Sequence, residues 1–155
     1  MDSKIFSEIP TPAYILEEDA LLKNARRLSL VQERTGCRIL LAQKAYSIYQ
    51  TYPLLKPYLA GTTASSLYEA RLGSEEFGGE THIFSPAYKP SEFAGILSVC
   101  DHIVFNSLSQ WERYHGQTQA APRRISCGLR INPEYAEVET DLYNPCIPGS
   151  RMGIR

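Results

Sequence analysis

Short apolar runs alternate along this chain with longer amphipathic stretches. A short run suits a buried strand of a parallel sheet, whereas a longer stretch places its apolar residues at helical spacing. The runs predict strands at 13–16, 39–42, 62–65, 82–84, 102–105 and 126–131. The stretches between them predict helices at 19–35, 48–59, 66–72 and 90–99, and another that begins near 109.

Polar residues mark several of the helix ends. Asp19 is suited to cap the first helix, and Gly36 is placed to end it. A serine followed three residues later by glutamate forms a capping box, in which each side chain bonds a backbone N–H of the first turn. This spacing occurs at Ser66–Glu69 and again at Ser109–Glu112.

Strands that alternate with helices indicate parallel βαβ units, either in an open doubly wound sheet or in a barrel. The Gly-rich fingerprint of a dinucleotide-binding fold is absent from the sequence, which favours the barrel. A complete (β/α)8 barrel takes about 250 residues. The 155 residues are therefore expected to form an α/β fold that is an incomplete barrel.

Composition narrows the class of protein. The chain is 43% apolar and 21% charged with a net charge of -1, so its charge gives no reason to expect nucleic acid or an anionic membrane as partner. The sequence contains neither an apolar run long enough for a membrane span nor the apolar core of a signal peptide. Four separated cysteines and three histidines without ligand spacing predict a cytosolic chain with reduced thiols and no metal.

The segment RILLAQKAYS, residues 38–47, carries the candidate chemistry. Side chains alternate along a strand, so Leu40, Ala42 and Lys44 are expected on one face, with the amine at the strand's carboxyl end. Partial burial there would favour the neutral, nucleophilic amine, which forms an imine with an aldehyde such as pyridoxal 5'-phosphate (PLP). A lysine that extends from the strand end into water is the other interpretation, and the pattern alone leaves both open.

The run LAQKAYS resembles the lysine strand of the fold-type-III PLP decarboxylases. The other segments that carry the resemblance follow the order and spacing of carboxynorspermidine/carboxyspermidine decarboxylases: TPAYILEEDALLKNARRL, TTASSLYEARLG, GGETHIFSPAYKPSEF, DHIVFNSLSQWER, CGLRINPEY and YNPCIPGSRMGI. The resemblance implies that residues 1–155 are the N-terminal part of a PLP-binding (β/α)8 barrel. It also assigns 13–16 to a β-domain sheet, and it places three barrel strands and the C-terminal β-domain outside the chain.

The resemblance further implies roles for individual residues. Lys44 would be the Schiff-base lysine, and Arg130 in GLRIN would bind the cofactor. At the position of Thr63, ornithine-decarboxylase-type members carry an aspartate, whereas the carboxynorspermidine enzymes carry a threonine. Four residues are weaker candidates for supporting the site or contacting substrate, each with an ordinary structural alternative: Ser66, Glu69, Ser85 and Tyr88.

The activity that the resemblance implies is PLP-dependent decarboxylation of carboxynorspermidine or carboxyspermidine in polyamine biosynthesis, by a cytosolic homodimer. A diaminopimelate- or arginine-decarboxylase-type enzyme of the same fold is a second interpretation. A non-catalytic PLP-binding or subunit-interaction module is a third, from a different class. The phosphate loop and the acidic partner of the pyridine nitrogen are expected beyond Arg155, so the chain alone is predicted to aggregate and to be inactive.

Overall fold

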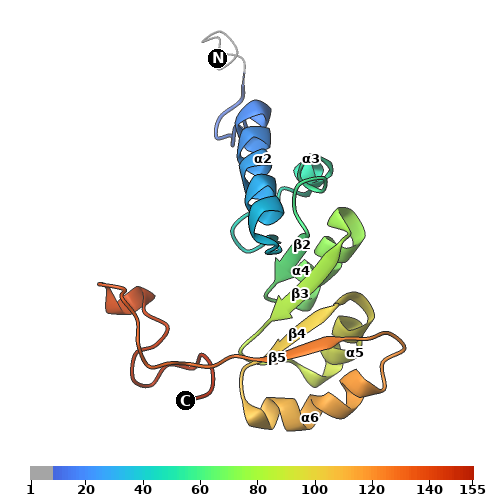
Figure 1. The fold of residues 1–155 in the computed structure, drawn as a ribbon, viewed down its shortest axis with the longest axis vertical. Helices are drawn as coiled ribbons and strands as arrows, with labels where there is room; N and C mark the ends of the chain where they lie inside the picture. Colours follow the sequence, from blue (N-terminus) through green and yellow to red (C-terminus); the bar gives the residue numbers. More distant parts are fainter. Residues whose placement is uncertain (1–8) are drawn as a thin grey trace.

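A computed structural model describes residues 9–155. Five parallel strands form one sheet in the order of the chain, β1-β2-β3-β4-β5 (Figure 1). The strands are Leu40–Ala42 (β1), Gly61–Ala64 (β2), Glu80–Phe84 (β3), His102–Phe105 (β4) and Ser126–Leu129 (β5). The helices are Glu18–Thr35 (α2), Tyr52–Leu55 (α3), Leu67–Leu72 (α4), Pro90–Val99 (α5) and Leu108–Gln119 (α6), with shorter turns at Tyr49–Thr51 (η1), Gly73–Phe77 (η2) and Asp141–Tyr143 (η3).

The helices cover one face of the sheet. Alternate strand residues such as Ile83, Ile103 and Phe105 are buried in a core shared with α4, α5 and α6. A second core lies between β1, α2 and α3, around Ala25 and Tyr52. The opposite face of the sheet is here called the inner face. The strand register pairs four of its half-buried residues side by side across neighbouring strands: Ala42, Thr63, His82 and His102.

This topology decides between the two predicted folds. A doubly wound sheet changes direction at a switch point and has helices on both faces, whereas consecutive barrel strands keep sequential order with helices outside. The described sheet has sequential order and one helical layer. The prediction of an incomplete (β/α)8 barrel is confirmed.

Several predicted elements agree with the structure. The helix at 90–99 and the strand at 102–105 have the expected bounds. Gly36 adopts a left-handed conformation, with φ of 71°, and its N–H bonds the carbonyl of Gln32. The capping box of α4 is present, because Glu69 N–H donates to Ser66 Oγ at 3.3 Å and Ser65 N–H donates to the Glu69 carboxylate at 2.7 Å.

Other boundaries were wrong. Asp19 lies in the first turn of α2 and does not cap it, since the helix begins at Glu18. The helix predicted over 48–59 is only η1 and the four residues of α3, because Pro53 opens a new helical turn and the chain leaves the helix before Pro57. The box predicted at Ser109–Glu112 lies two residues too late. Ser107 caps α6, and the Gln110 side chain returns the bond to Asn106 N–H at 2.6 Å.

The strand predicted at 13–16 is not formed. The segment precedes α2 without strand pairing among residues 9–155, and Tyr14 and Ile15 are exposed. A strand exists only where a neighbour completes its hydrogen bonds, so an apolar run by itself cannot establish one. Within the described part of the chain, none of the helices is both long and apolar enough to cross a bilayer.

Candidate functional site

The carboxyl edge of the sheet is where the predicted site residues gather. Lys44 is the second residue after β1 and is exposed. A tight turn begins at Ala42, whose carbonyl accepts hydrogen bonds from the N–H groups of Ala45 at 3.0 Å and Tyr46 at 3.1 Å. Lys44 therefore lies in this turn, beyond the last residue of β1, and its place on one face with Leu40 and Ala42 stays a prediction. Among the described residues Lys44 is exposed, so the expected partial burial is not seen there.

Gln43 holds the backbone from which Lys44 projects. Its side chain is 1% exposed and lies on the helical side of the sheet. Its Nε2 donates to the Glu69 carbonyl at 2.8 Å, and its Oε1 accepts from the Tyr52 hydroxyl at 3.2 Å. These bonds fix the end of β1 to both α4 and α3. Sequence analysis missed this residue, although a lone amide within the apolar run LLAQK was a usable signal.

Arg130 lies just beyond β5 at the same edge. Its N–H continues the ladder to the Phe105 carbonyl at 2.9 Å. Its guanidinium carbon lies 4.7 Å from the centre of the Phe84 ring, so the side chain reaches across the inner face to β3. A planar cation is thereby held at the carboxyl edge in a defined orientation.

The segment after β5 returns to this edge. Asn106, at the end of β4, donates from Nδ2 to the Arg151 carbonyl and accepts from Gly153 N–H, both at 2.8 Å. Ile154 N–H donates to the Arg130 carbonyl at 2.8 Å, and Asn132 N–H donates to the Ile154 carbonyl at 2.7 Å. Asn106 was also missed, because its partners lie more than forty residues away in the chain.

The four weaker candidates have structural roles. Ser66 and Glu69 cap α4, as described above. Ser85 Oγ donates to the Ala87 carbonyl at 3.0 Å. Tyr88 is 7% exposed, and its hydroxyl donates to the Val104 carbonyl at 2.8 Å. Burial raises the pKa of this phenol, and the position of Tyr88 favours a role in joining β3 to β4 over contact with a ligand.

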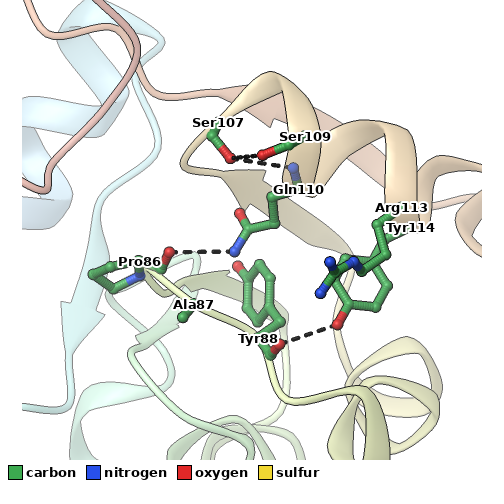
Figure 2. Close-up of a pocket in the computed structure, with 8 residues that line it drawn as sticks. All are labelled: Pro86, Ala87, Tyr88, Ser107, Ser109, Gln110, Arg113 and Tyr114. Carbon is green, nitrogen blue, oxygen red and sulfur yellow. Dashed lines mark hydrogen bonds between the residues drawn. The ribbon is translucent and has the colours of Figure 1, made fainter.

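A small hollow beside Tyr88 lies between the loop after β3 and the start of α6 (Figure 2). Its volume is about 150 Å³, and a hydrogen bond from Tyr114 to the Tyr88 carbonyl closes one side. Its lining includes none of Lys44, Thr63 and Arg130.

Thr63 completes the edge on β2, paired between Ala42 and His82. It offers a hydroxyl and no charge. Lys44 and Arg130 come after the first and fifth strands, so both lie at the carboxyl edge of the sheet. An amine, a guanidinium and a hydroxyl at one edge suit a ligand that carries a carbonyl and anionic groups.

Comparison with known proteins identifies relatives along the whole chain. No protein-family model matches it. A carboxyaminopropylagmatine decarboxylase of Synechocystis is 42% identical over 155 residues, and carboxynorspermidine/carboxyspermidine decarboxylases of Herminiimonas arsenicoxydans and Campylobacter jejuni are 41% and 43% identical over 145 and 150 residues. The matches cover 100%, 94% and 97% of this chain, and 40%, 39% and 38% of the relatives.

A solved structure agrees. The crystal structure of carboxynorspermidine decarboxylase from Campylobacter jejuni, complexed with norspermidine, superposes with a TM-score of 0.81 at 40% identity. The match covers 95% of this chain and 36% of that one. The chain thus spans about two fifths of the length of its curated relatives. In sequence and in fold, it is a homologue of part of the carboxynorspermidine/carboxyspermidine decarboxylases.

Proposed function

We propose that this chain supplies the Schiff-base lysine of a PLP-dependent decarboxylase that acts on carboxynorspermidine or carboxyspermidine. The observation that carries the proposal is the place of Lys44, two residues after the first strand of a sheet whose sequence and fold match those decarboxylases. We further propose that residues 1–155 form the N-terminal part of the barrel. Cytosolic location and a homodimeric assembly stay predictions from the resemblance.

The residues at the carboxyl edge suit PLP. Lys44 offers an exposed amine to the cofactor's aldehyde. When bound, PLP supplies an electron sink that stabilises the carbanion left by decarboxylation. Arg130, oriented against Phe84, can donate a hydrogen bond to the ring oxygen of the cofactor or pair with an acidic group beside it. Gln43 holds the end of β1 in place, so Lys44 starts from a rigid backbone.

The relatives support a carboxylated polyamine as substrate more than diaminopimelate or arginine, because all three are named for carboxylated polyamine-type compounds. Carboxyaminopropylagmatine is a second candidate substrate, since the relative with that name is 42% identical over the full chain. A non-catalytic binding module has no need of a lysine at this position. Turnover assays with each carboxylated compound separate these candidates.

Borohydride reduction of the complete enzyme tests the proposed lysine. The reaction should fix the cofactor on the peptide that contains Lys44, and label on another lysine would refute the assignment. Lys44→Ala should remove the absorbance of the cofactor's imine near the visible edge and abolish turnover. Lys89→Ala is the matched control, because Lys89 is exposed on the helical side and pairs with Glu92 at 3.0 Å. It should leave both readouts unchanged.

A further inference from the structure

A second cluster of reactive side chains lies on the inner face, where β3 and β4 pair. Glu80 and His82 belong to β3, and His102 begins β4. The strand register pairs His82 with His102. Their rings stack with centres 3.9 Å apart and an interplanar angle of 16°. His82 is the register neighbour of Thr63, whereas Lys44 and Arg130 lie beyond the carboxyl ends of β1 and β5.

We propose that Glu80, His82 and His102 form a binding site for a divalent transition-metal ion such as Zn²⁺. One ligand atom from each residue lies within 4.8 Å of the other two. Among residues 9–155, this is the group in which three such donors gather. Two imidazoles with one carboxylate are ligands for zinc and its neighbours, whereas Ca²⁺ and Mg²⁺ prefer oxygen alone.

The spacing of the donors is close to that of a coordination shell. Zinc binds nitrogen and oxygen ligands at about 2.0–2.2 Å, so two ligands of a tetrahedral site lie about 3.3 Å apart. His82 Nε2 and Glu80 Oε2 are already 3.2 Å apart. His102 would have to approach by at most about 1.5 Å to reach the same spacing. Rotation of the His102 ring about its χ2 torsion, which has a broad energy minimum, can bring the ligand atom this much closer.

Arg38 would compete with a metal ion for the Glu80 carboxylate. Its Nε donates to Glu80 Oε2 at 3.0 Å, but its side chain is 63% exposed and can leave without being buried elsewhere. Among the described residues, an open hollow of about 400 Å³ adjoins Glu80 and His102 and is lined also by Asp101, Arg124 and Ser126. It leaves room for a water molecule as a further ligand. A bound ion would link β3 to β4.

The test is a calorimetric titration of zinc chloride into the longest soluble form of the protein that contains residues 1–155, freed of metal with a chelator. We expect one bound ion per chain. Replacing either ligand histidine by alanine, or Glu80→Gln, should weaken binding by about tenfold or more. Arg38→Ala should bind at least as tightly as the unaltered protein. His115→Ala is the matched control, because His115 lies on α6 and stacks on Trp111, and its removal should change nothing.

Cobalt provides a second measurement that needs no variant. Co²⁺ added to the unaltered protein should give visible absorption typical of nitrogen and oxygen ligands, and Zn²⁺ should abolish it. The proposal is overturned if natively folded protein gives neither heat nor absorption. It is equally overturned if binding survives both histidine substitutions, or if His115→Ala removes it.

Discussion

Gln43→Leu is expected to destabilise the fold and to loosen the attachment of Lys44. The substitution keeps the size of the side chain but removes the bonds that join β1 to α4 and α3. Its two partners then differ in what they lose. The Glu69 carbonyl keeps a bond from Gly73 N–H, whereas the Tyr52 hydroxyl belongs to a residue with 0% exposure and loses its bond to Gln43.

These losses set the expected magnitude. A hydrogen bond to an acceptor that keeps a second partner contributes about 0.5–1.5 kcal/mol, and a buried hydroxyl left unpaired costs about 1–3 kcal/mol. Gln43→Leu should therefore lower the free energy of unfolding by about 2–4 kcal/mol. For a domain of this size or somewhat larger, this corresponds to a fall in Tm of about 4–15 °C.

Urea and thermal unfolding of the soluble protein that carries this chain provide the assay, with Gln117→Leu on the exposed side of α6 as the matched control. The control should change the free energy by less than about 0.5 kcal/mol. Tyr52→Phe added to Gln43→Leu removes the unpaired hydroxyl and should restore part of the lost stability. If Gln43→Leu behaves like the control, or if Tyr52→Phe makes it worse, the hydrogen-bonded role of Gln43 is refuted.

Four further outcomes are expected. Arg130→Ala should lower kcat by roughly 10²-fold with cofactor still bound, measured by turnover and absorbance of the complete enzyme; lost cofactor would contradict this role. Gly61→Ala would place a Cβ 1.9 Å from a backbone oxygen of β3 and should cost at least about 3 kcal/mol in urea unfolding, whereas Gly116→Ala, with open space around it, should stabilise by about 0.5–1 kcal/mol. Burial raises the pKa of Cys100 to about 12, so iodoacetamide at pH 8 should modify exposed Cys37 and spare Cys100 in the native state, as mass spectrometry can show. The 155-residue chain alone should elute as aggregates in gel filtration, because its inner face is uncovered; a monomer that unfolds cooperatively would contradict this.

Local patterns in the sequence determined the helix–strand alternation, the cap at Ser66 and the left-handed turn at Gly36. Each depends on residues only a few positions apart, which the chain brings together whatever its fold. The same holds for the place of Lys44 two residues after the first strand, since a strand and the residues that follow it are neighbours in sequence. Resemblance to the decarboxylases then assigned this lysine a role that the pattern alone left open.

Only the tertiary structure decided what lies beside what across strands. The register that stacks His82 on His102, the burial of Gln43 against α4 and the bonds from Asn106 to the returning segment join residues 20 to 47 positions apart. No local spacing encodes such contacts, because they arise from the way parallel strands align once helices have packed on one face. The run at 13–16 is a further example. Its residues suit a strand, but a strand forms only beside a partner strand, and local sequence does not show whether one is present.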